Sequence, residues 1–149
     1  MSDATQRRVV VGLDGSETSK SALEWAIIEA KALDAVLVLF NAWMVPMAVA
    51  PGYVGFWPDL EKVATEILAD AETRVAEVAP GLVVETMAVE EPPAPALVAI
   101  SESADLLVVG SRGLGGFKEL LLGSVSHFCV THAHCPVLVV RPAPKQASD

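Results

Sequence analysis

Basic residues are scarce in this sequence. Its 149 residues include 10 Lys and Arg against 19 Asp and Glu, which gives a formal net charge of −9. No basic cluster is larger than Arg7-Arg8. A surface of this sign repels the phosphate backbone of DNA and RNA, so the composition argues against a nucleic-acid-binding protein.

Cysteines and targeting signals are also few. The two cysteines, Cys129 and Cys135, lie close together near the C-terminus, which favours a reducing compartment over a disulfide framework. Residues 1–8 are polar and lead directly into an apolar run, so no export signal is evident. The stretch 35–58 is nearly uncharged, but its prolines and glycines would break a helix in lipid. We therefore expect a cytoplasmic protein with no membrane-spanning segment.

The apolar residues, 52% of the chain, fall into two alternating patterns. Five short runs rich in Val and Leu predict strands, and four of them are almost continuously apolar, as strands covered on both faces are. Between them the apolar period becomes helical, with a third helix expected over 95–103. This order predicts an α/β fold, a three-layer doubly wound parallel sheet with right-handed crossovers. The strands are expected at residues 8–13, 36–43, 82–89, 105–111 and 136–141.

One domain accounts for this length. We expect it to cover residues 1–149, with a core over 7–142 and a disordered tail over 143–149. Two connections are longer than βα loops usually are, the apolar segment 44–57 and the segment 112–122. Both follow strands at the carboxyl edge of the sheet, where doubly wound folds bind ligands.

Glycines gather in the second of these segments. They form the pattern Gly110-x2-Gly113-x9-Gly123-Ser124. Glycine lets backbone N–H groups approach phosphate oxygens, and a helix N-terminus near Gly123 would favour an anion. Taken alone, the same glycines also suit a connection that needs positive φ.

The spacing resembles the nucleotide-binding pattern of the ATP-binding branch of the universal stress protein family. Three segments agree in order and distance: VVVGLDGS at 9–16, ADLLVVGSRG at 104–113 and CPVLVVR at 135–141. The resemblance covers residues 7–142. It implies a Rossmann-like, adenine-nucleotide α-hydrolase-like fold with five parallel strands in the order 3-2-1-4-5.

The resemblance also implies a set of ligand contacts. Asp14 would contact the adenosine moiety, where a carboxylate can accept hydrogen bonds from ribose hydroxyls. Gly12 would lie under the ribose, Ala42 would face adenine, and Val109 would contact the base edge or ribose. The phosphates would be lined, mostly by main-chain donors, by Gly110, Arg112, Gly113, Gly123, Ser124 and Val125. The sequence departs from the family pattern in two places. At 90–93, before the third helix, it has Glu-Glu-Pro-Pro where members of the family often have glycine, and its segment 44–57 is unusually apolar.

Other chemistry is less well supported. Lys118 is not a P-loop lysine, because its surroundings lack the Gly-Lys-Ser/Thr ending. The histidines and cysteines over 127–135 lack paired metal-ligand spacing, so we expect no metal site. No general base accompanies the glycines, so we expect no catalytic residues and at most slow ATP hydrolysis. The three tryptophans, Trp25, Trp43 and Trp57, are interpreted as core and interface anchors.

Three functions remain open from the sequence. The first is a regulatory stress-response module that binds ATP, with or without Mg²⁺, and acts on a protein partner that the sequence does not identify. The second is an enzyme that hydrolyses ATP slowly or transfers adenylate. The third is a partner-binding protein that selects AMP or cyclic AMP, or binds little nucleotide. The resemblance implies a homodimer through the edge of the fifth strand, formed by Val137, Leu138, Val139 and Val140.

Overall fold

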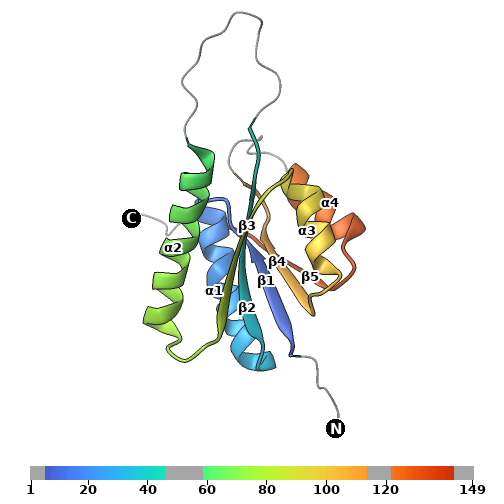
Figure 1. Ribbon diagram of the computed structural model, residues 1–149. Coiled ribbons are helices and arrows are strands. Elements are labelled where there is room, and N and C mark those ends of the chain that lie inside the picture. Colours follow the sequence, from blue (N-terminus) through green and yellow to red (C-terminus); the bar gives the residue numbers. More distant parts are fainter. Residues whose placement is uncertain (1–5, 46–58, 114–121, 143–149) are drawn as a thin grey trace, which may run out of the picture.

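The fold is a five-stranded parallel sheet between two layers of helices, as seen in a computed structural model that describes residues 6–45, 59–113 and 122–142 (Figure 1). The strand order is β3-β2-β1-β4-β5, which confirms the predicted fold class and topology. In chain order the elements are β1 Arg8–Gly12, α1 Glu17–Leu33, β2 Val36–Trp43, α2 Leu60–Val78, β3 Val84–Glu90, α3 Pro93–Ser101, β4 Leu106–Gly110, α4 Ser124–His132 and β5 Val137–Val140.

Both faces of the sheet are covered. Helices α1 and α2 pack on one face, and α3 and α4 pack on the other (Figure 1). Within β1, Val9 and Val11 point into the core beneath α1 and α2, whereas Val10 points into the core beneath α3 and α4. Every position in the middle of the strand is therefore buried, which explains why its sequence is continuously apolar.

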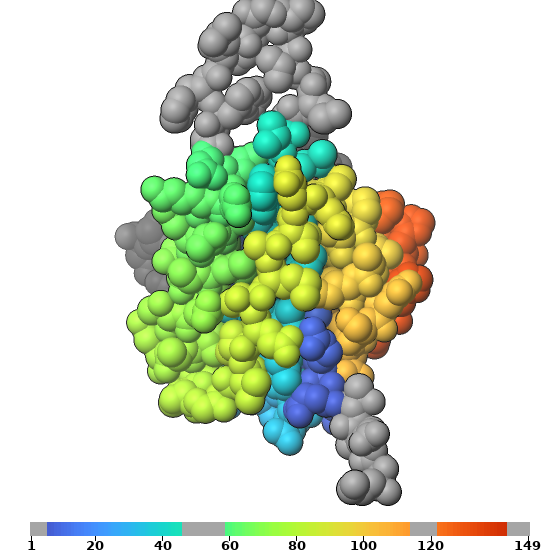
Figure 2. Space-filling view, viewed as in Figure 1, coloured from blue at the N-terminus to red at the C-terminus, as the bar shows by residue number. Residues whose placement is uncertain are grey.

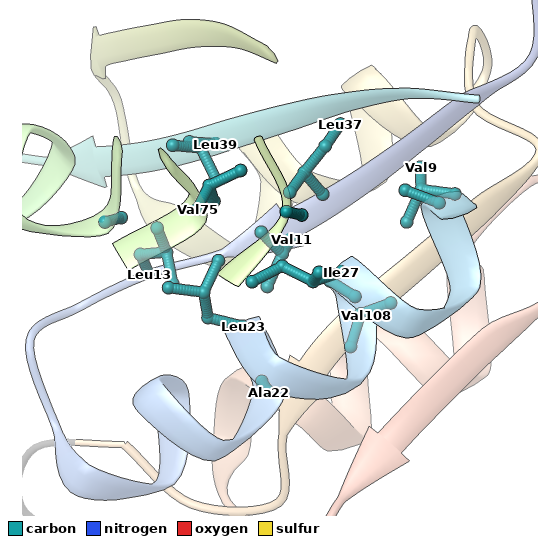
Figure 3. Close-up of a cluster of buried hydrophobic side chains, with 14 of the residues drawn as sticks. Val9, Val11, Leu13, Ala22, Leu23, Ile27, Leu37, Leu39, Val75 and Val108 are labelled. Atoms are coloured by element: carbon teal, nitrogen blue, oxygen red, sulfur yellow. The ribbon is translucent and has the colours of Figure 1, made fainter. Parts of the chain in front are cut away.

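The core beneath α1 and α2 is the larger cluster of buried residues. Figure 3 shows Leu37 and Leu39 of β2 beside side chains of β1 and of both helices. Leu13, one residue beyond β1, belongs to the same cluster and lies beside Leu23 of α1 (Figure 3). The packing therefore holds the chain against the sheet past the end of the first strand.

The two edge strands differ from the central ones. In β3 the four residues from Glu85 to Ala88 are exposed, and the strand runs along the surface between α2 and α3 (Figure 2). In β5 the first three residues are half-buried and only Val140 is fully buried. The exposure of β3 explains why the third apolar run of the sequence, which forms this strand, is less apolar than the others.

Helix boundaries follow the expected capping chemistry at two of the helices. Ser16 caps α1, with its Oγ accepting a hydrogen bond from Ser19 N at 3.1 Å. Asp59 caps α2 in the same manner through Lys62 N, also at 3.1 Å. Gly81, after α2, has a φ of 94°, which few other residues adopt without strain.

Two sequence predictions need correction. Helix α3 begins at Pro93 and ends at Ser101, two residues earlier than predicted, because Pro93 fits the first helical position, where no N–H donor is needed. Trp25 is not a core residue: it lies on α1 with 49% of its surface exposed.

Several predictions fall outside the described residues. These are the disordered tail over 143–149, the interpretations of Lys118 and Trp57, and the ligand or partner contacts of residues 46–57. Among the described residues, no helix is both long and apolar enough to cross a bilayer. Within the same ranges, no three His, Cys, Asp or Glu residues are grouped so that they could hold a metal ion.

Candidate nucleotide site

A cavity of about 490 Å³ opens at the carboxyl ends of the strands. It lies where the chain changes direction across the sheet: from β1 the strands continue through β2 to β3, and the chain then crosses to β4 on the other side of β1. Open α/β sheets bind ligands at such switch points, and the volume lies in the range of small-molecule sites.

All ten candidate residues contribute to the lining of this one cavity. They come from four segments that lie far apart in the sequence: the end of β1 with the residues just after it, the end of β2, the end of β4 with the turn that follows it, and the start of α4. The ten are Gly12, Asp14, Ala42, Val109, Gly110, Arg112, Gly113, Gly123, Ser124 and Val125.

Among the described residues, six more line the cavity that were not identified from the sequence: Leu13, Ser19, Phe40, Pro93, Leu97 and Ser126. Pro93 and Leu97 are the most informative of these, because they bring α3 to the cavity. Pro93 belongs to the stretch where the sequence departs from the family pattern. The available signal was that α3 begins directly after β3, so its first turn must lie at the carboxyl edge of the sheet.

A side chain at either of two glycines of the motif would meet a close neighbour. A Cβ on Gly110 would lie 2.7 Å from Thr18 Cγ2 and 3.2 Å from the Thr18 carbonyl carbon, because the end of β4 runs close to the start of α1. A Cβ on Gly113 would lie 2.5 Å from Asp14 Oδ2. At Gly110 the backbone of β4 therefore packs against α1 too closely for a side chain, whereas at Gly113 the close neighbour is the end of the Asp14 side chain.

Asp14 connects the first strand to this glycine turn. Its Oδ1 accepts a hydrogen bond from Ser16 N at 2.9 Å, in an Asx turn directly before α1. Its Oδ2 lies on the side of Gly113. The carboxylate is half-buried at the rim of the cavity, where it can accept hydrogen bonds from a ligand's hydroxyl groups.

The first turn of α4 is tied to the end of β4. Gly123 N donates to Ser111 O at 2.6 Å, and Ser126 Oγ donates to the same carbonyl at 2.9 Å. Gly123 is the N-cap residue and brings no side chain to the helix terminus. The N-terminus of α4 thus contributes to the lining of the cavity, and the N-terminus of a helix favours an anion.

Sequence comparison places this arrangement among known proteins. The family model described as the Universal stress protein family matches residues 5–141. The chain belongs to the universal stress protein family. The match spans every strand and helix that contributes to the cavity.

Curated relatives carry the same family name. Universal stress protein Rv2623 of Mycobacterium tuberculosis (strain ATCC 25618 / H37Rv) is 38% identical over 137 residues, which are 91% of this chain and 46% of that protein. Universal stress protein YxiE of Bacillus subtilis (strain 168) is 33% identical over 147 residues, covering 90% of this chain and 98% of the relative. The chain thus spans about half the length of the mycobacterial relatives it matches.

Solved structures agree with the fold. A universal stress protein crystallised in complex with cAMP superposes with a TM-score of 0.69 at 32% identity. The superposition covers 93% of this chain and 98% of that one. The overall architecture of this universal stress protein domain is therefore shared across nearly its whole length.

Proposed function

We propose that this universal stress protein domain binds ATP, with or without Mg²⁺, and acts as a nucleotide-dependent regulatory module in the stress response. The observation that carries the proposal is the convergence of all ten candidate residues on one cavity at the switch point. Gly113 supports it further, because the absence of a side chain leaves its backbone uncovered beside the Asp14 carboxylate.

The cavity offers different chemistry along its lining. Phe40, Ala42 and Leu97 supply apolar contacts suited to adenine. Asp14 offers a carboxylate to the ribose hydroxyls. The start of α4 offers unpaired N–H groups and the positive end of its dipole to the phosphates.

Cyclic AMP is the second candidate ligand. The observation in its favour is the solved relative in complex with cAMP, which is 32% identical to this chain. Both ligands contain adenosine and would occupy the same part of the proposed site. They differ in their phosphate groups, and therefore in their contacts with the glycine turn and the start of α4. ATP hydrolysis by this domain would be slow, and we assign no catalytic residue to it.

A homodimer through β5 is part of the proposal. Strand β5 pairs with β4 along one side, and Val137, Leu138 and Val139 are only half-buried. A groove beside this strand is lined by Ser21, Glu24 and Trp25 of α1 and by residues 138–142. Dimerisation through β5 would bury the apolar edge strand and the exposed Trp25 side chain beside it. The cytoplasmic location stays a prediction.

Calorimetric titration of ATP with and without Mg²⁺, AMP and cyclic AMP tests the ligand assignment. We expect saturable binding of ATP by the wild type and its loss in Gly113→Val, with circular dichroism unchanged. Tighter binding of cyclic AMP than of ATP would favour the second candidate. If no adenine nucleotide binds, and the purified protein carries none, the proposal is wrong and the partner-binding function takes its place.

A further inference from the structure

One buried polar side chain interrupts the apolar interior next to the cavity. Asn41 of β2 follows Leu37 and Leu39 along the strand and faces the same core beneath α1 and α2. Only 5% of its surface is exposed. Its Oδ1 is buried without a hydrogen-bond partner among the described residues. A Val or Leu would continue this apolar row without leaving a polar atom unpaired, so the amide calls for an explanation.

The other end of the amide makes a specific bond. Asn41 Nδ2 donates to Leu13 O at 2.7 Å, within the protein interior. Leu13 N donates to Phe40 O at 2.8 Å. Both backbone groups of Leu13 are thus attached to β2, although β1 itself ends at Gly12. Asn41 therefore extends the attachment of the first strand by one residue.

That residue directly precedes Asp14. The chain is fixed on one side by the two bonds of Leu13, and on the other by the Asx turn between Asp14 and Ser16. Between these anchors the Asp14 carboxylate approaches Gly113 across the cavity rim. Asn41 does not line the cavity, but its amide is hydrogen-bonded to Leu13, which does, so the side chain is connected to the cavity through Leu13.

We infer that Asn41 is a positioning residue of the nucleotide site, which holds the corner formed by Leu13 and Asp14 so that the carboxylate meets the ribose. The inference rests on the proposed function. It assigns to Asn41 a role in ligand discrimination that is separate from packing, since an apolar residue could fill the same place in the core.

The test compares two nucleotides that differ only at the ribose hydroxyls, ATP and 2′,3′-dideoxy-ATP. If Asp14 accepts hydrogen bonds from these hydroxyls, the wild type binds ATP about tenfold more tightly or better. Asn41→Leu keeps a similar volume but removes the donor to Leu13. We expect its preference for ATP to fall at least fivefold, towards equal binding of the two nucleotides.

The matched control is Val75→Ala, a core change in α2 at a side chain that is 2% exposed and lies outside the cavity lining. It destabilises the fold but leaves both hydrogen bonds of Leu13 in place, so its preference for ATP should equal that of the wild type. Amide exchange in the ligand-free protein gives a second readout. The Ser16 N–H should exchange faster in Asn41→Leu than in Val75→Ala. Asn41→Ser serves the same purpose if Asn41→Leu does not fold.

Each outcome separates the inference from the proposed function. An unchanged preference for ATP in the folded Asn41 variant would mean that Asn41 is only a core residue, while ATP binding stands. Equal binding of ATP and 2′,3′-dideoxy-ATP by the wild type would remove the Asp14 contact and the inference with it. Absence of ATP binding by the wild type would overturn both.

Discussion

Gly113→Ala adds a single carbon where the segments that follow the first and fourth strands approach each other. The new Cβ would lie 2.5 Å from Asp14 Oδ2, whereas ordinary contacts begin at 3.4 Å. The gap must therefore widen by about 0.9 Å, the difference of these two distances. Asp14 is the flexible partner, but its Oδ1 is engaged by Ser16 N at 2.9 Å, so moving the carboxylate disturbs the start of α1.

The expected effect is larger on binding than on folding. A displaced carboxylate loses its hydrogen bonds to the ribose, and bonds to a charged group contribute about 1.5–3 kcal/mol each. One such bond corresponds to a loss of roughly 10- to 150-fold in ATP affinity. Asp14 is half-buried and can turn towards water, so the free energy of unfolding should fall by only about 1 kcal/mol.

A double-mutant cycle measures whether the clash with Asp14 is the cause. Titration calorimetry of ATP into wild type, Gly113→Ala, Asp14→Ala and the double variant gives the four affinities. Because Asp14→Ala removes the obstructing carboxylate, Gly113→Ala should cost little further affinity in that background. Gly123→Ala controls for the coupling: its Cβ would meet nothing closer than 3.5 Å and no atom of Asp14, so its effect on ATP affinity should be the same in the wild-type and Asp14→Ala backgrounds. Equal losses from Gly113→Ala in both backgrounds would refute the reasoning.

Three further predictions concern the β5 surface and the core. Val139→Lys places a charge on the edge strand and should convert a dimer into monomers; an unchanged sedimentation profile would contradict the proposed interface. Trp25→Ser should weaken dimerisation about tenfold or more in sedimentation equilibrium while leaving the monomer's unfolding midpoint nearly unchanged, because the side chain is 49% exposed. Burial raises the pKa of the Cys129 thiol from 9.0 to about 11, so the folded state keeps this proton after the unfolded state has lost it. Wild-type stability to urea should therefore fall between pH 9 and pH 11, more steeply than that of Cys129→Ala; parallel curves would refute this assignment.

The fold was largely predictable because burial on both faces leaves a distinctive sequence. Val9, Val10 and Val11 belong alternately to the two cores, and that arrangement requires a continuous apolar run. The order of the strands in the sheet could not be predicted from the apolar pattern. It came from the family resemblance, since periodicity does not say which strand lies beside which.

The site was predictable where it depends on local sequence. Glycines at a strand exit and at a helix start signal close approach of the backbone, and all four motif residues do lie at the cavity. Leu97 was missed because it reaches the cavity through the packing of α3 on the sheet, next to Gly12, where a Cβ would lie 3.2 Å from Leu97 Cδ2. That contact joins residues 85 positions apart, and no spacing rule in the sequence encodes it.

Asn41 shows a different limit of sequence reasoning. In the sequence it interrupts an apolar run, and by hydropathy alone it marks only a break in a buried strand. Its meaning depends on the register between β1 and β2, which pairs Gly12 with Phe40 and so brings Asn41 beside Leu13. A single-residue change in that register would turn the amide away from the Leu13 carbonyl. The residues that touch the cavity can thus be read from motifs, whereas those that position them become visible only once the strands are paired.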